Sequence, residues 1–276
     1  MYKIVAGSSC DLTREMKERL GVSLVDFKIN IDGQEYIDDE DLDLYSMIDH
    51  MNRSKEIKTA CPAPGDFLKA YEGEEDVFVI TISKHLSGAY NAAVLARDMA
   101  LEEDGSKRIH VFDSESASAG ETLGAFRLKE LIDAGLSFEE IVDEMNKYIK
   151  ELKTFFILES LGNLIRNGRI SKTTGLIANV LNFKPIMQDD GSGNIELYEK
   201  VRGTKRAFSS LVKAIEKVGM KPEGRRLVIS HVNALKLAED LRDAIVEKYN
   251  FKEVLLVQTA GLCSVYADDG GIVLAY

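Results

Sequence analysis

Disulfide and metal chemistry have little support in this sequence. The chain of 276 residues has three cysteines, Cys10, Cys61 and Cys263, and no two of them have the CxxC spacing of a zinc or redox site. Its four histidines are scattered and form no ligand cluster. We therefore expect neither a disulfide framework nor a metal site, and no metal or organic cofactor.

Long apolar runs are also missing. No hydrophobic segment approaches the ~20 residues that a helix needs to cross a bilayer. The opening MYKIVAGSS holds only a short strand-like run, which is too short for the core of a signal peptide. We expect a soluble, cytoplasmic protein without a transmembrane segment.

The charge is acidic overall and basic in one segment. A net charge of −11 argues against nucleic acid as a partner. Between Leu164 and Arg206, however, eight lysines and arginines stand against four acidic residues. A solvated face is the ordinary explanation of such a run, and a docking surface is the alternative.

Strand and helix signals alternate through the first half of the chain. Residues 77–82 and 109–112 are typical of buried strands, and helices are predicted at residues 88–101, 119–134 and 137–152. This βαβ order predicts a parallel sheet with helices on both faces. Residues 22–31 predict one long strand, followed by an Asp32-Gly33 hairpin turn.

The pattern changes near residue 152. Beyond it, predicted hairpins are mixed with helical crossovers, which favours a mixed sheet. A chain of 276 residues with 45% hydrophobic content is a globular protein of one large or two ordinary domains. The predicted fold is α/β with two domains: residues 1–152 form a three-layer domain around a parallel sheet, and residues 153–276 form an α/β domain around a mixed sheet.

A hydroxyl and a glycine stand where a predicted strand meets a predicted helix. Ser87 and Gly88 lie in ITISKHLSGAYNAA, directly before the helical pattern begins. Backbone N–H groups at a helix start attract anions, glycine allows close approach, and serine adds a donor. The segment contains neither GxxxxGK[ST] nor GxGxxG. The residues alone indicate an anion site or simple turn chemistry, and leave both open.

Several motifs in sequence order resemble those of one protein family. ISKHLSGAYNAA resembles the LSGTY-type segment of the DegV family of bacterial fatty-acid-binding proteins, and TACPAPGDF resembles its TSxPSxxxF segment. Further resemblances are GSSCDL, VFDSESASAG, LGNLIRNGRISK, FKPIM and KVRGTKRA. The series spans nearly the whole chain, so the resemblance implies the family's two-domain α/β fold.

The resemblance also implies a ligand and a partner. In the family a long-chain fatty acid is bound with its carboxylate held by hydroxyls, and is presented to a separate fatty acid kinase that makes an acyl phosphate. This chain would then be a lipid-binding acyl carrier and not an enzyme, with the fatty acid as its ligand. The matching positions are Thr59, Ser87, Gly88 and Arg169 for the carboxylate, and Lys172 and Arg202 for partner docking or phosphotransfer.

The chain departs from the family pattern at several positions. Gly7 replaces the family's opening aspartate, and Ala60 replaces the second hydroxyl of TSxPS. At the C-terminus Ala267 stands in place of a histidine, with Asp269 and Gly270 in place of the following Gly-Pro. Alanine can neither donate a hydrogen bond nor position a proton as that histidine can.

The neighbours of Ala267 raise two further expectations. Tyr266 could substitute for the histidine, but its side chain would point away from the site if this segment is a strand. Asp268 and Asp269 would repel an anion if they face it.

Other functions stay open. The first alternative is a fatty acid carrier or sensor that is not coupled to a kinase, as the loss of the histidine at Ala267 suggests. A second is a small-molecule enzyme related to dihydroxyacetone kinases, although no histidine occupies a matching motif. Weaker hypotheses are a hydrolase using His85 with Ser87, or His231 with Asp113, and a calcium loop at residues 189–194.

Overall fold

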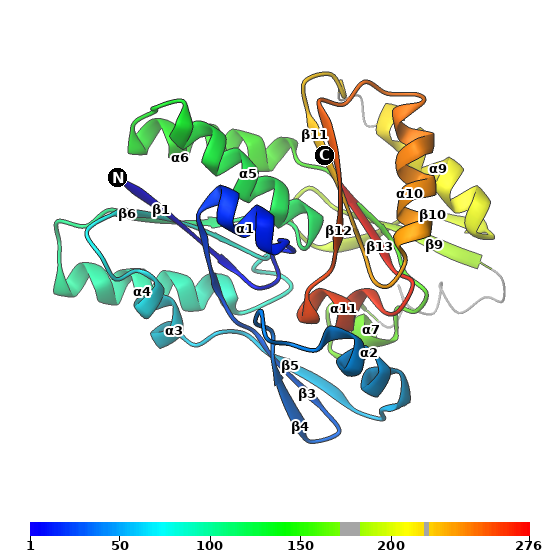
Figure 1. The fold of residues 1–276 in the computed structure, drawn as a ribbon, viewed down its shortest axis with the longest axis horizontal. Helices are drawn as coiled ribbons and strands as arrows, with labels where there is room; N and C mark the ends of the chain where they lie inside the picture. The colour runs from blue at the N-terminus through cyan, green and yellow to red at the C-terminus, as the bar shows by residue number, and fades with distance from the viewer. Residues whose placement is uncertain (172–182, 218–220) are drawn as a thin grey trace.

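The computed structural model describes residues 1–171, 183–217 and 221–276, and the predicted partner-surface residue Lys172 lies outside these ranges. Three sheets are present in the described part of the chain, two large and one small (Figure 1).

The first large sheet is entirely parallel. Its strands are β1 (Tyr2–Gly7), β2 (Val22–Val25), β6 (Asp76–Thr81) and β7 (Ile109–Asp113), in the order β2-β1-β6-β7. Both faces of this sheet are packed against apolar side chains, and for this reason its strands contain few polar residues. Helices α3 (Pro64–Ala70) and α4 (Ala89–Glu103) cover one face, while α1 (Arg14–Leu20), α5 (Ala119–Asp133) and α6 (Phe138–Glu151) cover the other. The predicted parallel sheet is confirmed.

The predicted strand over residues 22–31 is wrong as a single element. After β2 the chain leaves the parallel sheet and forms β3 (Lys28–Ile31), the centre of a small antiparallel sheet with β4 (Gln34–Ile37) and β5 (Ile57–Ala60). The change occurs at Phe27, whose backbone N–H donates to Ser8 Oγ at 3.1 Å and whose carbonyl accepts from Asp38 at 2.9 Å. The Asp32-Gly33 turn is confirmed. Helix α2 (Leu44–Arg53) packs beside this sheet.

The second large sheet is mixed, as predicted. Its order is β10 (Ile195–Arg202), β9 (Phe183–Asp189), β8 (Thr154–Ile157), β13 (Ile272–Ala275), β11 (Arg226–His231) and β12 (Glu253–Gln258). The β11–β12 pair is parallel and the other recorded pairs are antiparallel. Helices α9 (Thr204–Lys217) and α10 (Leu235–Val246) cover its outer face. In the sequence, the helical pattern of α9 extends from Thr204 to Val218, and its last residue lies outside the described residues.

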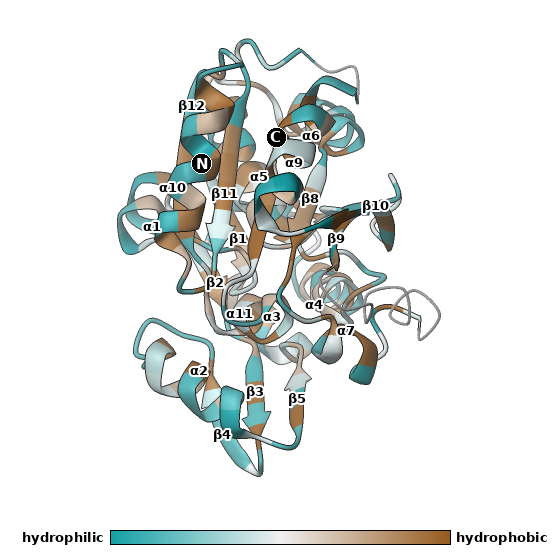
Figure 2. Cartoon of the chain, turned by 90° about the vertical axis from the view of Figure 1, so that its right-hand side faces the viewer, coloured by the Kyte–Doolittle hydropathy of each residue, from teal (hydrophilic) through white to brown (hydrophobic). Residues whose placement is uncertain are grey.

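Helix α5 lies between the two large sheets. Its residues from Ala119 to Phe126 are all buried, because one side packs on the parallel sheet and the other reaches the inner face of the mixed sheet. This first half of the helix is buried on all sides and needs no polar face, whereas the half beyond Phe126 is partly exposed. In Figure 2, strands β9 and β11 of the mixed sheet are largely brown, the colour of hydrophobic residues.

Strand pairing supports the predicted domain division. Among the described residues, no ladder joins a strand before Leu152 to one after it. We therefore propose the boundary between residues 152 and 153, with α5 as the layer through which the two halves meet. No helix within the described ranges combines the length and apolarity needed to span a membrane.

A glycine on α5 tests how tightly this layer is packed. A Cβ at Gly124 would lie 2.1 Å from Ile80 Cδ1, whereas a Cβ at Gly65, on α3, would meet nothing within 4 Å. Gly124→Val should lower the free energy of unfolding by about 2 kcal/mol through overpacking. Gly65→Val, the matched control, should change it by less than about 1 kcal/mol. Urea titration of both variants measures this, and equal losses would contradict the packing argument.

Candidate functional site

A cavity of about 350 Å³ lies where the carboxyl ends of β6 and β7 face the inner side of the mixed sheet. Ligands in α/β proteins commonly bind at this edge of a parallel sheet. The walls are largely apolar, and the volume is within the ~300–1,000 Å³ usual for small-molecule sites. The apolar lining residues are Phe27, Ile82, Leu86, Phe156, Leu158, Leu164, Ile195, Leu262 and Val273.

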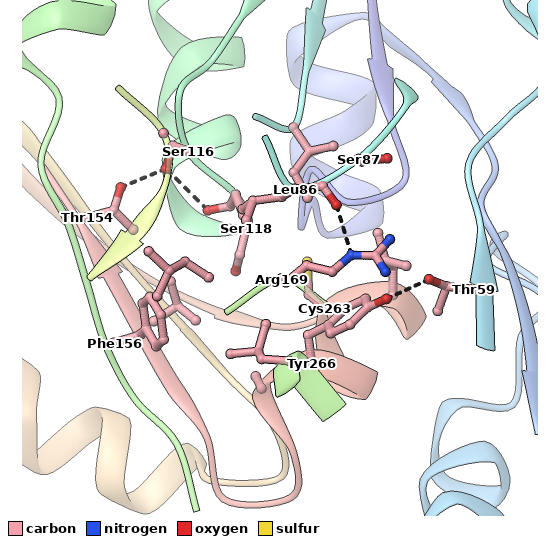
Figure 3. Close-up of a pocket in the computed structure, with 18 of the residues that line it drawn as sticks. Thr59, Leu86, Ser87, Ser116, Ser118, Thr154, Phe156, Arg169, Cys263 and Tyr266 are labelled. Atoms are coloured by element: carbon pink, nitrogen blue, oxygen red, sulfur yellow. Dashed lines mark hydrogen bonds between the residues drawn. The ribbon is translucent and has the colours of Figure 1, made fainter. Parts of the chain in front are cut away.

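The four residues predicted to hold a carboxylate all line this cavity. Thr59 comes from β5, Ser87 and Gly88 from the turn before α4, and Arg169 from the segment that follows α7 (Gly162–Arg166). Figure 3 shows Thr59, Ser87 and Arg169 on one side of the cavity, opposite Thr154 and Phe156. The structure therefore brings together donors that are up to about a hundred residues apart in sequence.

The turn before α4 positions Ser87. The backbone N–H groups of Leu86 and Ser87 donate to Ser83 O at 2.9 and 3.1 Å. Ser87 Oγ accepts the N–H of Ala89 at 3.2 Å, so its own hydrogen remains available to another acceptor. Gly88 is exposed, and a Cβ there would approach Cys61 Sγ to 3.3 Å. The strand, turn and helix start predicted here are confirmed.

Arg169 is fixed by the backbone on one side of its guanidinium group. Nε donates to Leu86 O at 3.0 Å and Nη1 donates to Asn167 O at 2.5 Å. Its Cζ lies 5.4 Å from the centre of the Tyr266 ring, within the range of a cation–π contact. Within the described residues Nη2 has no hydrogen-bond partner, so this part of the group can bind an anion.

Tyr266 is a cavity residue whose orientation depended on the secondary structure of its segment. The segment is helix α11 (Gly261–Ala267) and not a strand, and Tyr266 points into the cavity, where its OH lies 2.7 Å from Thr59 Oγ1 (Figure 3). Successive side chains alternate across a strand but differ by only about 100° around a helix. For this reason Tyr266 and Ala267 can line the same wall.

Ala267 occupies the position that the resemblance assigned to a histidine, and it contributes only a methyl group to the wall. The two acids that follow it do not line the cavity: Asp268 is half-buried and Asp269 is exposed. Neither carboxylate is therefore part of the cavity wall, and we do not expect Asp268 or Asp269 to repel an anion from there. Gly271 closes the turn tightly, since a Cβ there would lie 2.2 Å from Ala267 O.

Buried carboxylates hold the start of α11. Asp38 accepts from the N–H groups of Gly261 and Leu262 at 2.5 and 3.0 Å, and Asp11 accepts from that of Ala260 at 2.7 Å. These bonds satisfy helix N–H groups that have no partner inside the helix. Burial raises the pKa of Asp38 to about 6 and that of Asp11 to about 7, although hydrogen bonds oppose the shift.

A third buried acid joins this network. Glu121, in the first turn of α5, accepts from Ser9 Oγ at 2.9 Å, and Ser118 Oγ donates to Asp11. Burial raises the pKa of Glu121, and the nearby Asp11 adds to the shift. The GSSCDL segment thus connects α5 to α11. The family's opening aspartate would be crowded here, because a Cβ at Gly7 lies 3.0 Å from Phe27 Cε2.

The predicted partner-surface residue Arg202 lies apart from the cavity lining. It is exposed and lines a groove of about 650 Å³ together with Glu159, Phe183 and Lys184. Leu158 lines both the groove and the cavity. Within the basic segment, Lys184 pairs with Glu159, so its positive charge is partly balanced.

The hydrolase hypotheses find no hydrogen bond to support them. In the described residues neither His85 with Ser87 nor His231 with Asp113 is joined by one. Instead, Ala234 N–H donates to His231 Nδ1 at 3.3 Å, and Asp113 pairs with Lys84.

The suggested calcium loop is a hairpin turn that satisfies its own acid. Asp190 accepts from the backbone of Ser192 and Asn194 at 2.9 and 3.1 Å. These bonds outweigh the effect of desolvation and lower the pKa of Asp190 to about 2. The described residues contain no group of three or more metal-binding side chains.

Comparison with known proteins adds to this geometry. The model of the DegV family of uncharacterised proteins matches residues 1–276. The chain belongs to the DegV family. A DegV domain-containing protein of Streptococcus pyogenes serotype M18 is 38% identical over all of this chain and 99% of its own length.

Solved DegV structures share the whole fold. A family protein of Ruminococcus gnavus, with vaccenic acid, superposes with a TM-score of 0.94 at 36% identity. A family protein of Eubacterium eligens loaded with heptadecanoic acid and the Streptococcus pneumoniae Fatty Acid Kinase (Fak) B3 protein loaded with linoleic acid each give 0.92 at 34% identity. Each covers 100% of this chain and 99% of its own.

The buried acids should make the stability of the protein depend on pH. A carboxyl with a folded pKa of about 7 keeps a proton that the unfolded chain, with a pKa near ~4, has already released. Stability should therefore fall as pH rises, by about 1 kcal/mol between pH 6.5 and 8. Burial lowers the pKa of His110 and of His231, which makes stability rise with pH. This opposite effect is confined to pH values below about 6.5. Urea titrations at several pH values measure the slope.

Asp11→Asn is the matching variant. It keeps an oxygen to accept from Ala260 and removes the titration, so the decline above pH 6.5 should become shallower. An unchanged slope would assign the decline to other groups.

Proposed function

We propose that this DegV protein binds a long-chain fatty acid in the cavity and presents it to a separate fatty acid kinase. The observation that carries the proposal is a cluster of donors, Thr59, Ser87 and Arg169, at one side of a largely apolar cavity. Three related structures, at 34 to 36% identity, are described with fatty acids. The protein would act as a carrier, not as a catalyst.

The head group is the part of the ligand that requires these donors. A carboxylate is an acceptor only, and burying it without hydrogen bonds is very costly. Ser87 offers its hydroxyl hydrogen and Arg169 its Nη2, with Gly88 leaving the backbone accessible. Mostly neutral donors suit a ligand that must also be passed on, because they bind a charge less tightly than a fully paired arginine does.

The tail supplies most of the affinity. At ~0.8 kcal/mol per buried methylene, about fourteen methylenes give an upper limit near ~11 kcal/mol before the costs of association. The apolar walls formed by Phe156, Leu158 and Val273 are suited to this part of the ligand.

Presentation to a kinase would involve a second surface. Arg202 and Lys172 remain the proposed docking or phosphotransfer residues, and the groove that Arg202 lines adjoins the cavity at Leu158. One observation favours a carrier or sensor without kinase coupling as the second candidate: Ala267 places no proton-transferring group in the wall. The three cysteines are free, which fits the proposed cytoplasmic location.

Removing one head-group donor should weaken binding. Ser87→Ala deletes a hydrogen bond to a charged group, which is worth ~1.5–3 kcal/mol, so affinity for oleic acid should fall at least about tenfold. Ser106→Ala, an exposed hydroxyl in the turn after α4, is the matched control and should bind normally. Titration calorimetry compares the two. Unchanged binding in Ser87→Ala would remove Ser87 from the site.

The ligand itself is tested by mass spectrometry of an organic extract from the purified protein. We expect a near-stoichiometric fatty acid, and the spectrum would give its chain length. An empty extract, with no uptake of added palmitic or oleic acid, would contradict lipid binding.

Kinase coupling is tested separately with Ala267→His. Restoring the histidine should raise kinase-dependent formation of acyl phosphate from oleic acid. Turnover equal to that of the unaltered protein would show that Ala267 does not limit the transfer.

A further inference from the structure

The hydroxyls of Thr59 and Tyr266 form a pair at the head-group side of the cavity. Their oxygens are 2.7 Å apart, and both side chains line the cavity. Two hydroxyls carry two hydrogens, and a single bond between them uses one. Among the described residues, neither oxygen has another recorded partner. One O–H of the pair therefore remains available to a third group.

The ring of Tyr266 contributes a second constraint on the same site. It lies 5.4 Å from Arg169 Cζ, while the backbone carbonyls of Leu86 and Asn167 hold Nε and Nη1. The guanidinium group is therefore held by backbone acceptors and by an aromatic ring. Arginine donors that are already oriented lose less freedom when they bind an anion.

We propose that Tyr266 determines the specificity of this cavity for a carboxylate head group. The proposal rests on the function proposed above and assigns the role of the missing histidine to the residue next to Ala267. Through its hydroxyl Tyr266 supplies or orients the free O–H of the pair with Thr59, and through its ring it orients Arg169. An uncharged lipid end, such as a methyl ester, gains much less from these oriented donors than a carboxylate does.

Helix α11 explains why this role falls to residue 266. The helix start is fixed by Asp11 and Asp38, so the wall that carries Tyr266 is held in place from outside the cavity. The small side chain of Ala267 lies beside it on the same wall. Histidine at 267 and tyrosine at 266 are thus two ways of placing a donor on one helix.

The test measures head-group selectivity in the 276-residue protein. Dissociation constants for oleic acid and methyl oleate are compared in the unaltered protein and in Tyr266→Phe, which keeps the ring and removes the hydroxyl. We expect affinity for oleic acid to fall about tenfold, as for a lost hydrogen bond to a charged group, and affinity for methyl oleate to stay unchanged. Tyr266→Leu, which also removes the ring, should reduce the preference for the acid further.

Two further variants identify the cause. Tyr249→Phe is the matched control, because its hydroxyl donates to Val212 O at 2.8 Å in a region outside the cavity lining; it should keep the preference for the acid. Thr59→Val removes the other hydroxyl of the pair. Combined with Tyr266→Phe, it should cost less than the product of the two single effects, since both changes break one hydrogen bond.

Three results would overturn the assignment. If the protein binds oleic acid and Tyr266→Phe keeps its preference over methyl oleate, Tyr266 does not select the head group. If Tyr266→Phe weakens both lipids equally, its role is structural. If the unaltered protein binds neither lipid, the proposed function fails together with this inference, and this result is distinct from the other two.

Discussion

The site depends on the hydrogen bonds between two buried carboxylates and the start of α11. Asp11 and Asp38 come from the first forty residues, and the helix they hold is near the C-terminus. Burying these acids is unfavourable when they are ionised, which is why their pKa values rise. The cost is offset because the carboxylates satisfy N–H groups that a helix leaves unpaired. Tyr266, Cys263 and Ala267 can then line the cavity from one short helix.

The two large sheets contribute different parts of the site. Loops at the carboxyl ends of the parallel strands supply Ser87 and Gly88, while the inner face of the mixed sheet supplies apolar side chains such as Phe156 and Val273. Helix α5 packs on both sheets and therefore fixes the position of these two surfaces relative to each other. A ligand between them would contact a polar edge and an apolar face at once, as a fatty acid requires.

Sequence patterns were sufficient where the signal was local. The apolar run before Ser87 and the helix start after it are set by neighbouring residues, so this turn and its donors could be predicted. The break at Phe27 could not, because its partners Ser8 and Asp38 are distant in sequence. The same reason applies to Tyr266: the segment is a helix partly because remote acids hold its first turn, and its contact with Thr59 spans more than two hundred residues.

In the proposed head-group site, alanine in place of the family's histidine would change the available proton chemistry more than the ability to bind a carboxylate. A hydroxyl and an oriented arginine can both donate to a carboxylate, and neither of them needs to change protonation state to do so. A histidine can also accept or release a proton near neutral pH. The proposed site of Thr59, Tyr266 and Arg169 would therefore hold an anion but offer less for a step that moves a proton. Under the proposed function, binding and transfer would therefore be separable in this chain, with the cavity serving the first and position 267 limiting the second.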